Sequence, residues 1–459
     1  MIIQPNQFST HSLRRSPRGN DICHVLAAAI NSADAGVAIK NHISVDADHL
    51  ITSNSTYDLN EFKRIFIIGA GKAAVPMVKA IDEVLGGHIT SGMVITKDVY
   101  LSADNTILER HIKILEAGHP IPDQRNLDAS LQVNSLVNDI NKDDLVICLF
   151  SGGGSSLLIK PSQGISLKNI QETTALLLSC GATIDEINTI RKHMDDLKGG
   201  RLAKLLFPAA VISLVLSDVV GDRLDMIASG PTVADPTTFE DAWLILNKYQ
   251  IVDQIPTEIR SHISNGMLGI IPETLKPGDP ILDKIQNIIV GNNTQAALAA
   301  IQVASTLGFS TKLLTTTLQG EASLVGYSLS EGAIALLASP AYTSRPTCLI
   351  AGGETTVTMK GTGKGGRNQE LALGAVKSLS GSGQMILVSL ATDGGDGPTD
   401  AAGAVVTDQT YSLGLAKGLD STEYLKRNDS YHYFEPLGDL IKTGPTLTNV
   451  NDLVFIFGE

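Results

Sequence analysis

The sequence predicts an α/β protein built from two three-layer α/β/α domains. The chain has 459 residues, about three times the length of a typical single domain. Short apolar runs alternate with amphipathic stretches, and glycine-rich joints separate them, as in sheets whose strands are connected by helices. The proline-rich stretch 272–280 interrupts this alternation. We therefore expect an N-terminal domain at 21–275 and a C-terminal domain at 281–459.

Apolar runs and helical periodicity locate the elements of the N-terminal domain. In chain order they predict a helix at 22–40, a strand at 65–68, a helix at 73–85, strands at 93–96, 112–115 and 145–150, helices at 167–180 and 184–205, and a strand at 211–216. The run at 145–150 is almost wholly apolar, which is typical of a strand buried on both faces. Doubly wound α/β topology is the arrangement that this order favours.

The same alternation restarts after the connector. Strands are expected at 288–290, 312–316, 347–351, 355–359, 385–391 and 453–457. At the other end of the chain, the first 20 residues hold Arg14, Arg15 and Arg18 but no acidic residue. We expect a disordered tail at 1–20, and a targeting segment is the alternative that the same composition fits.

Composition limits the classes of function. The net charge is −13, which argues against a broad nucleic-acid surface. No apolar run approaches the ~18 residues that span a bilayer, so no membrane segment is expected. The four cysteines show no metal-binding or disulfide spacing, which favours a reducing compartment. We expect a cytoplasmic protein with small-molecule ligands, and a homodimer is left open.

Two glycine-rich loops follow predicted strands of the N-terminal domain. The first, Gly69-x-Gly71-x-x-Ala74, fits a dinucleotide fingerprint and favours a Rossmann-like domain, with Asp98 as the candidate ribose-binding acid. Lys72 suits a phosphate clamp better than a dinucleotide turn, and a solvated loop lysine is the plainer alternative. The second loop supplies backbone N–H groups and hydroxyls for phosphate oxygens. Its candidate phosphate-binding residues are Ser151, Gly152, Gly153, Gly154, Ser155 and Ser156.

A cationic helix provides candidates for binding a carboxylate. Arg191 and Lys198 are seven residues apart and share a helical face, and His193 lies between them. We expect these three residues to bind an anionic substrate. A solvated, charged helix face is the alternative.

Acidic loops supply candidates for a metal ion and a base. Asp218 directly follows a buried strand, and Asp393 and Asp396 follow the strand that ends at Ala391. Carboxylate oxygens suit Mg²⁺, and an aspartate at a strand end suits the acceptor of a hydroxyl proton. Arg367 adds a cation in a glycine-rich loop. Cationic clamps together with carboxylates are the groups that phosphoryl transfer needs.

Taken together, these motifs resemble the glycerate 2-kinase family, whose C-terminal part is the MOFRL domain and some of whose members are labelled hydroxypyruvate reductase. The resemblance covers nearly the whole chain after about residue 21. It rests on motifs that include Ile68-Gly-Ala-Gly-Lys-Ala73, Gly118-His-Pro-x-Pro122, Ser151-Gly-Gly-Gly-Ser-Ser156, Arg191-Lys-His193, Ala228-Ser-Gly-Pro-Thr232, Gly365-Gly-Arg-Asn-Gln-Glu370 and Thr392-Asp-Gly-x-Asp-Gly-Pro-Thr399. Val220 and Leu447 depart from the family pattern.

The resemblance implies ATP-dependent phosphorylation of glycerate at its 2-hydroxyl, with Mg²⁺ or Mn²⁺, at a site in the interdomain cleft. It implies catalytic roles for Lys72, Asp218 and Arg367, and the acidic loops make Asp218, Asp393 and Asp396 the candidate metal ligands. An NAD(P)-dependent hydroxypyruvate reductase is the main alternative, since it uses the fingerprint at 69–74. A non-catalytic protein that binds nucleotides or organic anions is a third.

Overall fold

The computed structural model describes residues 2–97, 111–338 and 346–458. The chain forms two compact units. The N-terminal unit comprises residues 38–217 and 222–290, and the C-terminal unit comprises 1–37, 218–221 and 291–459. The predicted domain limits therefore differ from the observed units in two places, at the N-terminus and after the proline-rich connector. Strand β9 (Ile285–Gly291) completes the N-terminal sheet, while helix α2 (Gly19–Ser32) packs on helix α12 (Asn293–Thr306) of the C-terminal unit.

A six-stranded sheet organises the N-terminal unit, in the order β6-β5-β4-β7-β8-β9. Its other strands are β4 (Arg64–Ala70), β5 (Ser91–Thr96), β6 (Ile112–Glu116), β7 (Asp144–Phe150) and β8 (Ala210–Leu216). The pairs from β6 to β8 are parallel. Every strand predicted for this domain is confirmed. The chain order reverses between β4 and β7, and such a switch point is where open α/β sheets bind ligands.

Burial explains why β7 occupies the centre of this sheet. All seven of its residues are buried, as the apolar run predicts. Its register with β4 pairs Ile68 with Cys148 and Ala70 with Phe150. The two strands therefore end side by side, and the two glycine-rich loops begin at the same edge.

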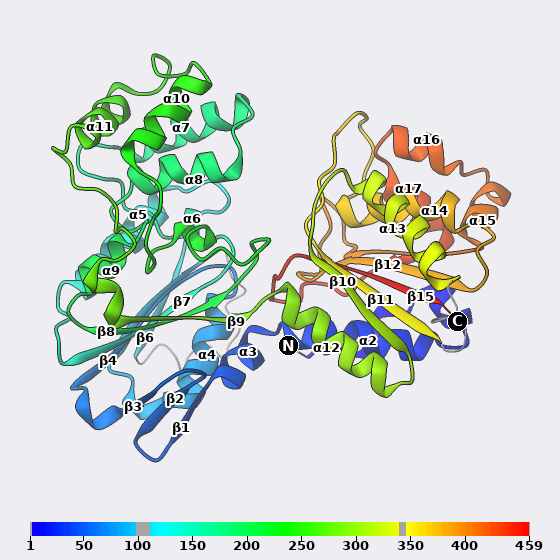
Figure 1. Cartoon of the computed structure of the whole chain (residues 1–459), viewed down its shortest axis with the longest axis horizontal. Helices are drawn as coiled ribbons and strands as arrows, with labels where there is room; N and C mark the ends of the chain where they lie inside the picture. The colour runs from blue at the N-terminus through cyan, green and yellow to red at the C-terminus, as the bar shows by residue number, and fades with distance from the viewer. Residues whose placement is uncertain (1, 98–110, 339–345, 459) are drawn as a thin grey trace. The chain divides into compact units, whose positions relative to one another are not determined.

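Four helices form a separate cluster within the N-terminal unit (Figure 1): α7 (Leu167–Ser179), α8 (Ile184–His193), α10 (Phe239–Lys248) and α11 (Thr257–Met267). Their apolar faces share a core that includes Ile190, Phe239 and Ile263. The helix predicted at 184–205 is interrupted. Helix α8 ends at His193, a turn with left-handed Gly199 and Gly200 follows, and α9 (Arg201–Leu206) begins after it.

Further helices and a small antiparallel sheet complete the N-terminal unit. Helix α4 (Ala74–Leu85) contacts β4, β5 and β7, and α5 (Gln124–Val137) contacts β5 and β6. The short helix α6 (Gly154–Leu157) starts within the second glycine-rich loop. Helix α3 (Ala35–His42) precedes a small antiparallel sheet, β1 (Ile43–Asp46), β2 (His49–Thr52) and β3 (Thr56–Asp58), which was not predicted.

The C-terminal unit contains a second six-stranded sheet, in the order β10-β11-β15-β12-β13-β14. Its strands are β10 (Ser310–Leu318), β11 (Thr347–Gly353), β12 (Met385–Ala391), β13 (Gly403–Thr407), β14 (Leu440–Ile441) and β15 (Asp452–Gly458). Only β10 and β11 pair in parallel. Helices α2 and α12 cover one face, and α13 (Ala322–Leu337) and α14 (Arg367–Leu379) cover the other, so the three-layer prediction is confirmed for this unit (Figure 1).

Two sequence predictions for the C-terminal unit were incomplete. The strand expected at 355–359 does not form, and Thr356 makes only an isolated bridge with Glu321. Strands β13 and β14 were not predicted. They are short and pair antiparallel at the sheet edge, so alternation of long strands and helices gave no signal for them.

The N-terminal segment is ordered, which corrects the disordered-tail prediction. Residues Pro5–Phe8 form a 3-10 helix and His11–Arg15 form α1, and Ile3, Phe8 and Leu13 are buried. The Arg18 guanidinium lies 4.2 Å from the ring centroid of Phe309 and donates to the carbonyl of Leu307. Burial of these apolar side chains outweighs the polar composition of the segment.

Within the described ranges, no single helix is long and apolar enough to cross a membrane. Helices α2 and α3 meet that criterion only as a pair bent by 65°.

Candidate active site

The two glycine-rich loops at the switch point are bonded to each other. The main-chain N–H of Lys72 donates to the carbonyl of Gly152 at 2.9 Å, and the N–H of Ala73 donates to Ser151 Oγ at 3.0 Å. In the other direction, the N–H of Ser151 donates to the carbonyl of Ala70 at 3.2 Å. The structure thus brings together the loops that the sequence analysis predicts to bind phosphate.

Close approach explains the glycines in these loops. A Cβ at Gly71 would lie 2.0 Å from Ser151 Oγ, and its φ of +147° also disfavours other residues. A Cβ at Gly153, where φ is +83°, would lie 2.8 Å from His119 Nε2. Side chains at either position would force the loops apart.

The second loop presents open backbone donors. The N–H groups of Gly154 and Ser156 bond to carbonyls of the loop itself. Among the residues that the structure describes, the N–H groups of Gly152, Gly153 and Ser155 have no acceptor. Successive open N–H groups between a strand and a helix form a concave seat for an anion. In the first loop, by contrast, the N–H groups of Lys72 and Ala73 already have acceptors. The partly buried side chain of Lys72 is therefore the group of this loop that can bind a phosphate.

His119 lies beside the Gly153 loop, and the sequence analysis did not select it as a site residue. It follows β6 in the segment Gly118-His119-Pro120, so its position after a predicted strand was the available signal. Burial, followed by the charges of Lys72 and Lys97, lowers the pKa of His119 to about 4. The imidazole is therefore neutral at physiological pH and adds no charge beside the Gly153 loop.

The side chain of Asn126 positions the His119 segment. It accepts from the N–H of Gly118 at 2.9 Å, donates to the carbonyl of Gly118 at 3.0 Å, and donates to the carbonyl of Ser156 at 2.8 Å. Asn126 is fully buried. This one amide therefore ties the loop after β6 to the loop after β7.

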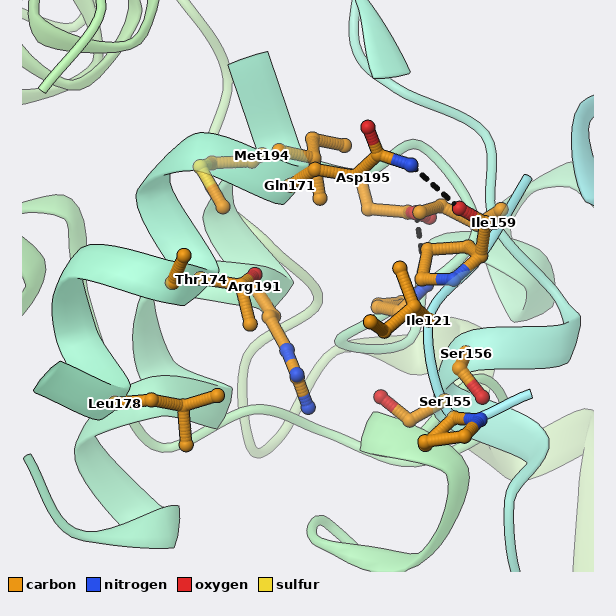
Figure 2. Close-up of a pocket in the computed structure, with 15 residues that line it drawn as sticks. Ile121, Ser155, Ser156, Ile159, Gln171, Thr174, Leu178, Arg191, Met194 and Asp195 are labelled. Carbon is orange, nitrogen blue, oxygen red and sulfur yellow. Dashed lines mark hydrogen bonds and ion pairs between the residues drawn. The ribbon is translucent and has the colours of Figure 1, made fainter. Parts of the chain in front are cut away.

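A pocket of about 620 Å³ borders the second glycine-rich loop (Figure 2). It is lined by Pro120, Ile121, Pro122, Ser155, Ser156, Ile159, Ile170, Gln171, Thr174, Ala175, Leu178, Arg191, Met194, Asp195 and Lys198. Figure 2 shows the Arg191 side chain extending from α8 into the pocket toward Ser155. Within the described part of the chain, no carboxylate forms an ion pair with this guanidinium, and burial lowers its pKa. An unpaired, partly buried guanidinium favours binding of an anion.

Lys198 and His193, the other two predicted substrate ligands, differ in placement. Lys198 lines the pocket, where its Nζ lies 2.8 Å from Asp195 Oδ2 and donates to the carbonyl of Leu158 at 2.7 Å. His193 is buried away from the pocket. Its Nδ1 lies 2.7 Å from the carbonyl of Thr189, and its Nε2 lies 3.2 Å from Glu273 Oε2. Both ring nitrogens therefore already have protein partners, which disfavours the substrate-binding role predicted for His193.

A chain of hydrogen bonds supports Ser155 from behind. Its Oγ lies 2.6 Å from Ser229 Oγ, which in turn donates to Asn188 Oδ1 at 3.3 Å. Ala228, Ser229 and Gly230 all have positive φ, at 50°, 59° and 60°. Two consecutive non-glycine residues in this region are uncommon and store backbone strain, which occurs more often near functional sites.

Arg367, the predicted catalytic arginine, lies at the start of α14 in the C-terminal unit. Its Nε lies 2.5 Å from Asp452 Oδ2, its Nη2 lies 3.1 Å from Asp452 Oδ1, and its Nη1 lies 2.5 Å from Glu354 Oε1. These carboxylates raise its pKa further above an already high value, although burial opposes them. The side chain is one-third exposed, at 33 %. The guanidinium is thus fixed by two carboxylates and still reaches solvent.

Asp396, a predicted metal ligand, serves instead as a helix cap. Its Oδ1 accepts from the N–H of Asn368 at 3.0 Å, and its Oδ2 accepts from the N–H and the side-chain Nε2 of Gln369, both at 2.9 Å. Both oxygens are buried and occupied at the start of α14. These bonds disfavour the metal role predicted for Asp396.

Asp218 and Asp393 remain candidate metal ligands. Asp218 Oδ2 accepts from Asn449 Nδ2 at 3.3 Å, and Asp393 Oδ1 accepts from the N–H of Gly395 at 3.0 Å. In the described ranges, no group of three or more histidine, cysteine or acidic side chains is arranged to hold a metal ion. The residues present fit a Mg²⁺ ion held mainly by nucleotide phosphates, with one or two carboxylates, and not a cage made of protein alone.

Comparisons with known proteins show which family this chain resembles. Residues 21–264 match the family described as "Domain of unknown function (DUF4147)", and residues 347–452 match the MOFRL family. The glycerate 2-kinase of Pyrococcus horikoshii is 41 % identical over 94 % of this chain and 95 % of its own length. The chain belongs to the glycerate kinase family. The D-glycerate 2-kinase of Thermotoga maritima is 44 % identical over 85 % of this chain and 90 % of its own length.

The fold agrees with this family as well. A crystal structure of glycerate kinase from Thermotoga maritima matches with a TM-score of 0.81 and 40 % identity, over 94 % of this chain and 97 % of that chain. Other relatives in the family carry the name hydroxypyruvate reductase. Asp98, the acid that a dinucleotide reading of the first loop would use, lies outside the described residues.

Proposed function

We propose that this protein is a glycerate 2-kinase, which transfers the γ-phosphoryl group of ATP to the 2-hydroxyl of glycerate and yields 2-phosphoglycerate and ADP. One observation carries the proposal. Ser155 and Arg191 line the same pocket. Among the described residues, the loop of Ser155 has three N–H groups without an acceptor, and the Arg191 guanidinium has no ion pair. A loop that can bind phosphate lies beside a cation that can bind a carboxylate. This pair of groups suits a reaction between a phosphorylated donor and a small carboxylic acid as acceptor.

Arg191 and the loop at 151–156 have separate roles in this proposal. Arg191 binds the carboxylate of glycerate, which orients its 2-hydroxyl. The open N–H groups of Gly152, Gly153 and Ser155 hold phosphate oxygens, and the Lys72 ammonium offsets the charge that spreads over the transferred group. Holding both reactants in line accounts for much of the rate in such reactions, because little covalent chemistry is left to the protein.

The transfer forms a bond between glycerate O2 and the γ-phosphorus and breaks the bond to the β–γ bridging oxygen of ATP. The hydroxyl proton leaves to a base, for which we propose Asp218. Asp393 would hold a Mg²⁺ ion bound with ATP, which would neutralise phosphate charge, and a role as metal ligand is the alternative to the base role for Asp218. Arg367 is proposed to stabilise the transition state, which requires its guanidinium to serve a phosphoryl oxygen in addition to Asp452.

Two assays on the purified protein decide between a kinase and a reductase. The first measures ADP release with ATP, Mg²⁺ and D- or L-glycerate. Enolase is then added without a mutase, so that only 2-phosphoglycerate yields phosphoenolpyruvate, which is detected by its absorbance. The second follows NAD(P)H oxidation with hydroxypyruvate. We expect ADP and phosphoenolpyruvate in the first assay. Rapid NAD(P)H oxidation without ADP release would overturn the proposal.

A further inference from the structure

A second pocket, of about 560 Å³, lies in the N-terminal unit next to the pocket that contains Arg191. Its lining includes Lys160, Asp196, Arg201, Lys204, His262 and Glu273. The two pockets have no lining residue in common, although Asp195 lines the first and its neighbour Asp196 lines the second. Nothing in the proposed phosphoryl transfer uses this second pocket.

The two acidic residues of the second pocket already have partners. Asp196 Oδ1 accepts from Ser162 Oγ at 2.7 Å, and its Oδ2 lies 3.8 Å from Lys160 Nζ. Glu273 Oε2 lies 3.0 Å from Lys276 Nζ, and its Oε1 accepts from the N–H of Phe239 at 2.8 Å. Each carboxylate is thus matched by a lysine.

Arg201 and Lys204 have no such partner. Arg201 Nη1 donates to the carbonyls of Lys192 and Asp195 at 2.7 and 2.8 Å, and Lys204 Nζ donates to the carbonyl of Glu273 at 3.1 Å. No described carboxylate lies within ion-pair distance of either cation. The two are close enough that the charge of Arg201, after burial, helps to lower the pKa of Lys204. Burial lowers the pKa of Arg201, and nearby carboxylates, Asp196 foremost, partly oppose that effect. In the described structure, the two cations on one turn of α9 therefore have negative charge nearby but no direct ion pair.

His262 adds an unsatisfied polar group on the same pocket. The residue is only 7 % exposed, and its Nε2 has no hydrogen-bond partner among the residues that the structure describes. A buried nitrogen without a partner costs free energy, which a ligand can recover. Leu205, Ile270 and Ile271 give the pocket an apolar wall as well.

We propose that the second pocket binds a small phosphorylated anion, with Arg201 and Lys204 holding the phosphate. A phosphate group carries about −1.5 to −2 charge near pH 7, which matches two adjacent cations. Its several oxygens allow bonds to both side chains at once. Free inorganic phosphate and the phosphate of a small ester share this chemistry, and the apolar wall favours an ester.

Hydrogen–deuterium exchange of the full chain with inorganic phosphate, and separately with glycerol 3-phosphate, tests the proposal. We expect protection of 201–206 and 262–273 that saturates with the ligand. Lys204→Gln should weaken this binding about tenfold or more, as for loss of one charge-assisted bond. Lys204→Arg should retain it. Lys168→Gln, which removes an exposed lysine outside this pocket, is the matched control.

The exchange pattern separates this proposal from the proposed kinase activity. Protection confined to 151–156 would overturn the second site and leave the kinase assignment intact. Equal affinity of wild type and Lys204→Gln at 201–206 would also overturn it. Tighter binding of glycerol 3-phosphate than of phosphate would identify an ester as the ligand, and the reverse order would identify free phosphate. Failure of the glycerate assays would not alter the exchange result.

Discussion

The main-chain N–H of Lys72 donates to the carbonyl oxygen of Gly152 across 2.9 Å, and this bond joins the loops that follow β4 and β7. Ser151 Oγ strengthens the junction by accepting from the N–H of Ala73 at 3.0 Å. The open N–H groups of the second loop therefore lie on backbone that a neighbouring strand end holds in place. Such preorganisation lowers the cost of binding phosphate oxygens.

Ser151→Ala should destabilise this junction. The substitution removes the acceptor of the buried Ala73 N–H, and an unsatisfied buried donor costs about 1–3 kcal/mol. We expect the free energy of unfolding in urea to fall by that amount and the KM for ATP to rise. Ser179→Ala, at an exposed helix end, is the control. Unchanged stability would show that Ser151 Oγ does not support the loops.

Arg191→Gln should impair binding of glycerate. The guanidinium has no competing ion pair in the described structure, so its charge is available to the substrate carboxylate. A hydrogen bond to a charged group contributes about 1.5–3 kcal/mol, so the KM for glycerate should rise about 10- to 100-fold. The KM for ATP should change much less. Lys168→Gln is the control, and an unaltered KM for glycerate would contradict the assignment.

Arg367→Ala separates a catalytic role from a structural one. An arginine that stabilises the transferring phosphoryl group contributes about 10³-fold or more to kcat. We therefore expect kcat to fall by that factor, with a smaller change in the KM for ATP. The variant also leaves Asp452 without its partner, so Tm is measured in parallel. Glu354→Gln, which removes only the second ion pair, should retain most of kcat. A lower Tm with near-normal kcat would limit Arg367 to a structural role.

Asp396→Asn and Asp393→Asn should affect different properties. Asp396 caps α14, and loss of a helix cap costs about 0.5–2 kcal/mol, so its variant should lower stability and leave the Mg²⁺ dependence unchanged. Asp393→Asn should raise the Mg²⁺ concentration needed for half-maximal activity. Titration of Mg²⁺ at fixed ATP, together with urea denaturation, measures both. A Mg²⁺ requirement that shifts only in Asp396→Asn would reverse our assignment.

His119 should make stability depend on pH below neutrality. Burial and two lysines lower its pKa from 6.5 to about 4. Between these pH values the His119 side chain stays neutral in the folded state, whereas in the unfolded state it takes up a proton. The free energy of unfolding should therefore fall as the pH drops from about 6.5 to 4. His119→Gln should flatten this dependence, and the exposed His24→Gln should not. Urea denaturation at several pH values measures the slope, and identical slopes for wild type and His119→Gln would refute the prediction.

Much of the architecture was predictable because it depends on local pattern. The buried strand 144–150 is a continuous apolar run, and the loops that follow β4 and β7 have glycines at the close contacts. Glycine-rich turns after buried strands indicate where anions bind, whatever else surrounds them. The sequence alone therefore determined the α/β class, the positions of the main strands, and Lys72 with the loop 151–156 as a candidate phosphate site.

The tertiary structure decided which side chains remain available for chemistry. Arg191, Lys192 and His193 are consecutive in the sequence, yet only Arg191 lines the pocket, whereas Lys192 pairs with Asp235 at 2.6 Å and His193 bonds to Thr189 and Glu273. In the same way, Asp393 and Asp396 share one loop, but only Asp396 caps a helix. Availability depends on partners that lie far away in the chain, as Glu273 lies 80 residues from His193. Such partners become known only when the fold sets their distances, because a local motif specifies residue type and spacing but not what lies opposite.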